Sequence, residues 1–317
     1  MDKKTSQSLI SRYCNFEVMT YLLLFLFPIA GMLVRGWLTN IFNLLFLVSL
    51  FYLHKRDKPL HKEDKVYLGI CAAYVGIYVL SSIVNGWGDI QTHDLGTEIR
   101  FLLIIPIYLM IREQPESWRW LLYGSLLGIV VIFIQACHEV YWQGKGMAWG
   151  VYSKNIIGPF AALMGFWILF LWQEQPYRLY RSLIIIVFVL AVLATALSGS
   201  RGAYVGLMFL VCGGLLIFIR TRWVFAAAVL AFFLLGLVYQ NTPIVKQGIN
   251  QAIDGARVYL SNPDIARSKK SLGSTELHME MWRATQYFFS DHPIIGVGPG
   301  NYASAAKKYA QEQLYLI

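Results

Sequence analysis

The chain has 317 residues, of which 57% are hydrophobic and only 14% are charged. Soluble domains carry about 25% charged residues, so this composition excludes an ordinary soluble protein and predicts a polytopic membrane protein. The formal net charge is +9, but the lysines and arginines are spread over short polar segments. That distribution is typical of loops that set membrane orientation, and we expect no nucleic-acid partner.

Nine mainly apolar runs follow one another along the chain, and a membrane helix needs roughly 20 such residues. We therefore predict an all-α transmembrane bundle of about nine spans. The fourth run is short and contains Pro106, so it is either a broken helix or one that begins earlier. The first run has no small-residue cleavage site, which favours an uncleaved membrane helix. The runs lie near residues 17–34, 37–53, 66–84, 100–111, 118–137, 155–172, 182–198, 203–219 and 222–239.

Lysine and arginine are distributed unevenly between the two sides of this predicted bundle. The N-terminal tail and the segments on its side carry 14 of them, whereas the opposite short loops carry five. The excess of positive charge predicts a cytoplasmic N-terminus, and with nine spans everything after about residue 240 lies outside. The five on the external side are Arg35, Arg100, Lys145, Lys154 and Arg201.

The chain thus divides into a transmembrane bundle, residues 1–239, and an external, partly helical segment, residues 240–317. In that segment "SNPDIARSKKSLGS" predicts a loop, and "STELHMEMWRATQYFF" predicts an amphipathic helix capped by Ser274 or Thr275. "SDHPIIGVGPGNY" is a turn dense in Pro and Gly, whose glycines permit tight turns. Asn301 is predicted to start another helix from about residue 302.

Arg201 lies in "LSGSRGAY", between two apolar runs on the external side. Its guanidinium offers a planar fork of donors that suits phosphate oxygens, and its Ser and Gly neighbours let a ligand approach closely. The residues alone leave two interpretations open. Arg201 binds the diphosphate of a lipid-linked substrate at headgroup depth, or it is a snorkelling side chain that anchors the helix end.

"LSGSRGAY", followed by further spans and by "MEMWRATQYFFSDHPIIGVGPGNY", resembles the O-antigen ligase family over roughly residues 150–310. Such a resemblance implies a glycosyltransferase of the bacterial inner membrane. It would move a glycan from an undecaprenyl-diphosphate carrier to lipid A–core at the periplasmic face, among membrane lipids. Related members polymerise O-antigen or glycosylate pilin, and both alternatives stay open. The resemblance also implies that Arg201 holds the carrier's diphosphate and that Asn155, near a helix start, is a weaker candidate.

Members of the family usually have a second arginine, four residues before the Trp of the external helix. This chain has His278 at that position. Histidine is charged only near or below pH 6.5, so it is a weaker standing partner for phosphate. The loop residues Arg267, Lys269 and Lys270 are alternative sources of positive charge. Arg201 and His278 are the candidate catalytic residues, and the candidates for substrate binding are Arg201, Arg283, Arg267, Asn155 and Asn301.

The family's essential histidine, usually followed by Asn, comes after the "GVGPGNY" turn, and the chain reaches Ile317 without it. The resemblance therefore implies a chain cut short before further spans, either a fragment of an active ligase or a shortened reading frame. No cofactor is expected. The external carboxylates Asp89, Asp94 and Glu98 are too loosely spaced to predict a metal site, and they indicate a solvated loop.

An alternative of another class is a multi-span transporter. Transporters usually carry charged or polar groups buried in mid-span, or broken helices in two similar halves. The predicted spans are nearly free of charge, and the polar residues gather at one outer face. This pattern favours an enzyme that works at the membrane interface.

Overall fold

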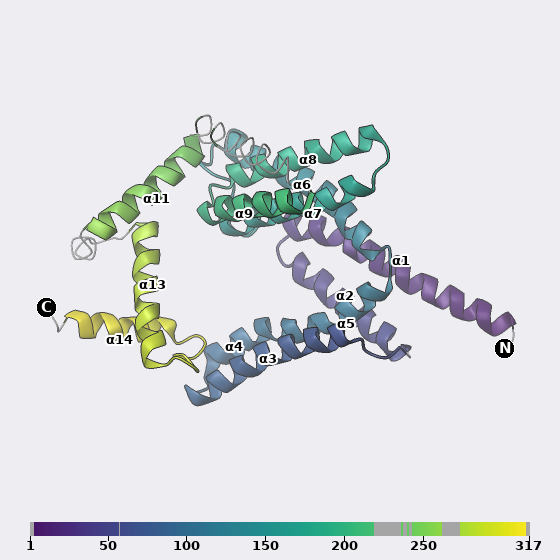
Figure 1. Cartoon of the computed structure of the whole chain (residues 1–317), viewed down its shortest axis with the longest axis horizontal. Helices are drawn as coiled ribbons and strands as arrows, with labels where there is room; N and C mark the ends of the chain where they lie inside the picture. The colour runs from purple at the N-terminus through teal and green to yellow at the C-terminus, as the bar shows by residue number, and fades with distance from the viewer. Residues whose placement is uncertain are drawn as a thin grey trace. The chain divides into compact units, whose positions relative to one another are not determined.

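The computed structural model describes the chain in six stretches, and every regular element within them is helical (Figure 1). This confirms the predicted all-α class. The stretches are residues 3–56, 58–218, 236, 240, 243–261 and 273–314.

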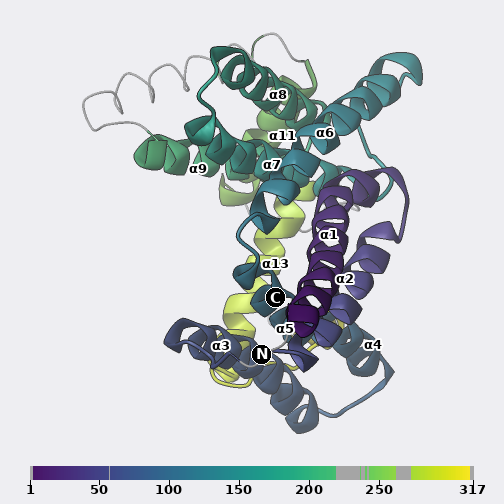
Figure 2. The ribbon, with the colours of Figure 1, turned by 90° about the vertical axis from the view of Figure 1, so that its right-hand side faces the viewer.

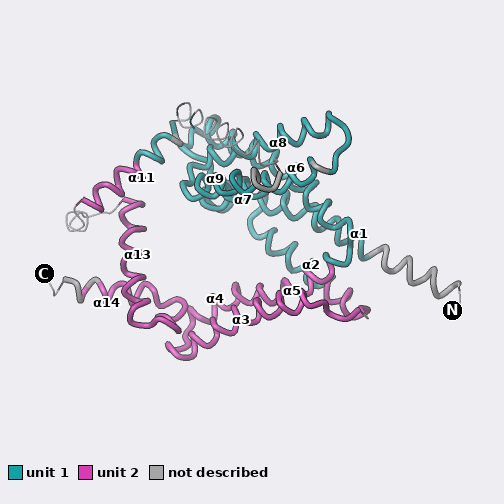
Figure 3. Tube along the Cα trace, viewed as in Figure 1, with its two compact units in different colours: residues 1–48, 111–250 teal, residues 49–110, 251–317 magenta. Residues whose placement is uncertain are grey.

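Contacts within the chain define two compact units (Figure 3). Unit 1 contains residues 1–48 and 111–250, and unit 2 contains residues 49–110 and 251–317. Helix α2 (Trp37–His54) therefore begins in unit 1 and ends in unit 2.

Six of the described helices are long and apolar enough to cross a membrane, and each corresponds to one predicted run. Backbone N–H and C=O groups have no water to bond to in lipid, so a helix of this length satisfies them internally. The predicted count of nine spans is not confirmed. The six apolar stretches are Phe16–Leu33, Trp37–His54, Lys62–Val84, Ser117–Trp142, Lys154–Trp172 and Arg178–Leu197.

The other three predicted spans differ for separate reasons. Helix α5 (Arg100–Glu113) has only 14 residues, and it follows α4 (Asp89–Glu98) after a single residue. The fourth run is thus the later part of a helical segment that begins earlier. Helix α9 (Arg201–Phe218) has a described apolar stretch, Arg201–Gly213, shorter than a span. The run 222–239 lies outside the described residues except for position 236.

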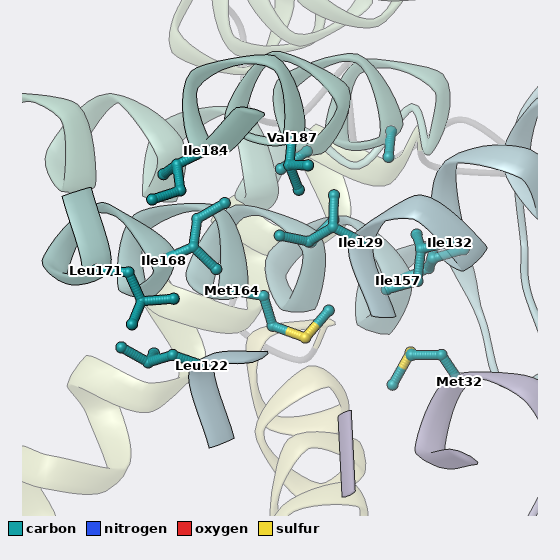
Figure 4. Close-up of a cluster of buried hydrophobic side chains, with 13 residues drawn as sticks. Met32, Leu122, Ile129, Ile132, Ile157, Met164, Ile168, Leu171, Ile184 and Val187 are labelled. Carbon is teal, nitrogen blue, oxygen red and sulfur yellow. The ribbon is translucent and has the colours of Figure 1, made fainter. Parts of the chain in front are cut away.

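Unit 1 is built around α6 (Ser117–Cys137), α7 (Lys154–Glu174) and α8 (Arg178–Leu197), which contact one another. Helix α9 lies against α7, and α1 (Lys3–Leu33) lies against α6 (Figures 1 and 2). The core that α1, α6, α7 and α8 share consists of branched, sulfur-containing and small alanine side chains (Figure 4). Its fully buried members include Ile129, Ile132, Met164, Ile168 and Leu171.

Glycines bring the helix backbones of unit 1 close together. A Cβ atom at Gly124 of α6 would lie 2.1 Å from the carbonyl oxygen of Phe25 on α1. A Cβ at Gly165 of α7 would lie 2.7 Å from that of Ala191 on α8. Small residues are the usual means of close helix packing in membranes, where shape replaces the hydrophobic effect between helices.

Unit 2 contains α3 (Lys62–Val84), α4, α13 (Ser274–Asp291) and α14 (Tyr302–Leu314), with the end of α11 (Pro243–Ser261). The prediction of a helix from about residue 302 is confirmed, whereas α11 was not predicted. Its polar sequence lacks the continuous apolar run that marked the spans.

Two local predictions in unit 2 are wrong. Helix α13 is capped by Gly273 rather than by Ser274 or Thr275, because the Glu276 carboxylate accepts the Gly273 backbone N–H and closes the first turn. The carboxylates Asp89, Asp94 and Glu98 do not lie in a loop but on α4. There the Tyr74 hydroxyl donates to Glu98 Oε2 at 2.6 Å, which ties α4 to α3.

Candidate functional site

The connection between α8 and α9 presents Arg201 at the first position of a helix. Gly199 adopts a φ of +63°, the left-handed conformation that commonly ends a helix. The Ser200 backbone N–H donates to Ser198 Oγ at 3.2 Å, and both serines are buried. Arg201 itself is half-buried. The serines and glycine therefore serve the backbone of this turn, which sets the position of the arginine.

Asn155, near the start of α7, contacts the same turn. The Ser200 hydroxyl donates to Asn155 Oδ1 at 3.4 Å. A Cβ at Gly158, one turn later, would lie 2.4 Å from Ser198 Oγ, so the α7 backbone approaches the turn directly. The structure thus brings Asn155 and the turn of Arg201 together across 45 residues of sequence. Their roles in substrate binding stay predictions.

A buried glutamate that the sequence did not single out holds the loop before α7. Glu139 lies in the short π-helical segment His138–Trp142, and its carboxylate accepts the Trp149 N–H at 2.6 Å and the Gly150 N–H at 3.2 Å. Lys145 Nζ lies 3.8 Å from the other carboxylate oxygen. The only sequence signal was a carboxylate at the end of an apolar run.

Hydrogen bonds place three basic segments at one end of unit 1. The Gly36 N–H donates to the Tyr152 hydroxyl at 3.0 Å, and the Ala148 N–H donates to the Leu197 carbonyl at 2.8 Å. The turn at residues 34–36, the loop at 143–153 and the Ser-Arg-Gly turn are therefore neighbours. These segments carry Arg35, Lys145 and Arg201, and Lys154 follows directly at the start of α7. All four were predicted to share one side of the membrane.

In unit 2, His278 and Arg283 lie on different faces of α13. Five residues of an α-helix turn through about 140° relative to the starting direction. His278 is exposed, and its Nδ1 faces the Ser274 carbonyl, which only accepts hydrogen bonds. Nδ1 therefore carries a proton, and Nε2 is the nitrogen left for a ligand. Arg267 lies outside the described residues.

The turn between α13 and α14 has the tight geometry predicted for its glycines. Gly296, Gly298 and Gly300 have φ values of +69°, +87° and +73°. Asn301 closes the turn, because its Nδ2 donates to the Val297 carbonyl at 3.1 Å. Its Oδ1 accepts a hydrogen bond from Gln91 Nε2 at 3.1 Å. Both ends of the Asn301 amide thus make structural contacts.

Two buried residues of the α3–α4 region fasten this turn, and sequence reasoning missed both. Gln91 Nε2 also donates to the Pro299 carbonyl at 2.8 Å, and Ser81 Oγ donates to the Ile295 carbonyl at 2.7 Å. The Gly88 N–H donates to Gln91 Oε1 at 3.0 Å, so the whole Gln91 amide is engaged. A single polar residue in a polar segment offers no signal of such a partner more than 200 positions away.

The predicted site residues form two groups. Arg201 and Asn155 belong to unit 1, whereas His278, Arg283 and Asn301 belong to unit 2 (Figure 3).

Helices of membrane-spanning length, joined at one end of unit 1 by basic turns, define a polytopic membrane protein. Residues 186–316 match the family model described as O-antigen ligase, a range that begins within α8 and includes all of α14. This match makes the second part of the chain similar to the O-antigen ligase family. An uncharacterised protein of Haemophilus influenzae is 24% identical over 255 residues, which cover 78% of this chain and 62% of that relative. The chain thus spans less than two thirds of the length of the curated relative it matches.

Proposed function

We propose that this chain acts in the transfer of a glycan from undecaprenyl diphosphate to lipid A–core at the periplasmic face of the bacterial inner membrane. The family match supports a membrane O-antigen ligase or polymerase type of function in general. The donor, the acceptor and the residue roles are our inference. The observation that carries it is Arg201, half-buried on a turn that three buried or left-handed residues hold in place.

The chemistry requires stabilisation of a departing diphosphate. An acceptor hydroxyl oxygen bonds to the anomeric carbon while the bond from that carbon to the diphosphate oxygen breaks, and the hydroxyl proton passes to a base. Negative charge grows on the diphosphate. Arg201 stabilises this charge with its fork of donors, and the N-terminus of α9 adds the positive end of the helix dipole.

Asn155 and the unit 2 residues take supporting roles in this proposal. Asn155 orients the turn through Ser200 and offers its amide to the phosphate or sugar. A protonated His278, Arg283 or Arg267 supplies the second positive group. Asn301 shapes the turn that follows α13 and contributes its remaining donor to the glycan.

A transporter is less well supported than an enzyme. Among the described residues, the buried charged side chains are Asp64, Glu139 and Glu276, and each lies near a helix end. Apart from these carboxylates and the buried side-chain oxygen of Gln135, the buried polar groups within the described spans are small hydroxyls such as Thr20, which donates to the carbonyl of Phe16. A conduit for a charged solute is expected to carry ionisable groups in mid-span. O-antigen polymerisation and pilin glycosylation remain alternatives that differ only in the acceptor.

Glycan transfer in a ligase-deficient strain tests the proposal. We expect Arg201→Ala to lower the transfer that the unaltered protein supports by about 10²–10³-fold, the usual cost of losing one transition-state donor. Arg201→Lys retains the charge but loses the fork of donors, so we expect it to keep only part of the glycan transfer. Arg35→Ala is the matched control, an arginine at the same end of unit 1 outside the motif. Equal activity of Arg201→Ala and Arg35→Ala would contradict the role of Arg201.

The acceptor is tested separately. If the protein rescues a polymerase-deficient strain but not the ligase-deficient strain, the acceptor is a growing O-antigen chain and not lipid A–core. Alanine at His278, Arg283 and Arg267, each introduced singly, identifies the second positive group by its loss of transfer. If none of the three lowers transfer, the second positive group lies elsewhere.

A further inference from the structure

A basic hollow lies at the end of unit 1 opposite to Arg201 and takes no part in the proposed transfer. It occupies about 460 Å³ where α7 ends and α8 begins. The apolar stretches Lys154–Trp172 and Arg178–Leu197 both terminate at this level, so the hollow sits where membrane spans meet the headgroup region. Its lining residues are Trp172, Arg178, Arg181, Ser182, Ile185 and Ile186.

The Arg181 guanidinium is held in place without being neutralised. Its Nε donates to the Gln175 carbonyl at 2.7 Å, and its central carbon lies 5.2 Å from the centroid of the Trp172 ring. These contacts orient the guanidinium and leave its two terminal NH₂ groups to donate. Arg178, three residues earlier on α8, is exposed on an adjacent part of the helix surface.

Arg119 lies at the same end of unit 1 and, unlike Arg178 and Arg181 among the described residues, is paired with carboxylates. Arg119 donates to Glu174 Oε2 at 2.9 Å and to Glu116 Oε2 at 2.6 Å. In the described part of the chain, neither Arg178 nor Arg181 makes an ion pair with a carboxylate. The hollow therefore carries two positive charges that no described carboxylate balances.

The rest of the hollow is apolar and faces away from the core. Ile185 and Ile186 are 45% and 56% exposed, and they belong to a helix of membrane-spanning composition. They follow Arg178 by seven and eight residues, which is a distance of about 10–12 Å along a helix axis. That distance separates a lipid phosphate from the upper part of its acyl chains. Trp172 at the rim fits the aromatic belt of a membrane interface.

We propose that this hollow binds an anionic phospholipid. The lipid phosphate lies against Arg178 and Arg181 with the Ser182 hydroxyl as a further donor, and an acyl chain covers Ile185 and Ile186. Basic pockets between transmembrane helices are a known means of binding anionic headgroups. A free phosphate ion would use the arginines but leave the two isoleucines uncovered, so the apolar part of the lining favours a lipid. The proposal is independent of glycan transfer.

Native mass spectrometry of the delipidated chain in detergent tests this site. Phosphatidylglycerol and phosphatidylcholine with identical acyl chains are the probes, since only the first is anionic at neutral pH. We expect tighter binding of phosphatidylglycerol and a fall of about fivefold for each arginine changed to glutamine, hence roughly 25-fold for Arg178→Gln with Arg181→Gln. Arg119→Gln is the matched control, because it removes the same charge at the same end from an arginine already paired with carboxylates.

Several results of these measurements would contradict the proposal or the assignment of a lipid. Equal binding of the two lipids, or an equal loss in Arg119→Gln and in the double variant, overturns the proposal. Inorganic phosphate that displaces phosphatidylglycerol at matched concentration shows a simple anion site and overturns the lipid assignment. If the double variant fails to elute as a folded protein, Arg178→Gln gives the test alone, since Arg178 is exposed and the contacts with Gln175 and Trp172 belong to Arg181.

Discussion

At the scale of single residues, Glu139 shows how one carboxylate organises the end of a helix bundle. A charged group that is buried must be paired or hydrogen-bonded, and Glu139 meets this requirement with two backbone N–H groups and Lys145. The loop it holds donates from Ala148 to Leu197, the last residue of α8. Glu139 therefore supports the turn of Arg201 without belonging to its motif.

Replacement of Glu139 by alanine is expected to lower the free energy of unfolding by about 1–3 kcal/mol, because it leaves the N–H groups of Trp149 and Gly150 without their acceptor. Glu139→Gln retains an acceptor oxygen and should recover part of this loss. Thermal unfolding in detergent, followed by circular dichroism, measures both. Glu174→Gln, which alters an exposed ion pair, should leave the Tm nearly unchanged. A Glu139→Ala chain as stable as Glu174→Gln would refute this account.

At the scale of elements, glycine spacing decides which helices meet. Gly124 and Gly128 lie one turn apart on α6, and Cβ atoms there would lie 2.1 Å from the Phe25 carbonyl oxygen and 3.0 Å from that of Pro28. The two positions form a smooth strip against which α1 packs. Pro28 has no N–H to donate, so α1 lacks one backbone hydrogen bond at this crossing.

Gly124→Ala should separate α1 from α6 and reduce stability by about 1–3 kcal/mol, since the added methyl group meets a backbone atom that has no freedom to rotate away. Gly206→Ala is the control. A Cβ at Gly206 has no neighbour within 4 Å, and alanine favours helix over glycine by about 1 kcal/mol. The Tm in detergent should therefore fall for the first variant and hold or rise for the second. The same response in both would show that the close approach at Gly124 has no energetic consequence.

At the scale of the whole molecule, the question is which parts face which side of the membrane. Within unit 1, the turns that carry Arg35, Lys145 and Arg201 are joined at one end. The absolute orientation, with these turns in the periplasm, and the external position of residues 240–317 stay predictions from charge.

Single cysteines in a background without the four native ones test that orientation. Lys145→Cys and Asp291→Cys, both exposed, should react in intact cells with a thiol reagent that crosses only the outer membrane. Glu116→Cys, at the opposite end of unit 1, should react only after the inner membrane is broken. The reverse pattern would invert the topology. Labelling of Lys145→Cys without Asp291→Cys would place residues near α13 on the cytoplasmic side.

Much of the helical framework was predictable because lipid imposes a simple requirement. A spanning helix needs about 20 apolar residues, and six runs of that kind became helices at nearly the predicted positions. The short polar helices were not predictable in this way. Helices α4 and α11 have no long apolar run, and the cap at Gly273 depends on the Glu276 side chain that folds back onto it.

The sequence by itself determined the membrane class, the resemblance to O-antigen ligases and the choice of Arg201 as the residue to examine, because composition and short motifs are local properties. Tertiary structure alone decided that Ser200 bonds to Asn155 and that Gln91 fastens the turn at Pro299 and Asn301. Those partners lie 45 and more than 200 residues apart in the chain. The physical reason is that helices in lipid associate through shape and small residues, so the polar contacts at their ends follow from the packing rather than from any pattern in the local sequence.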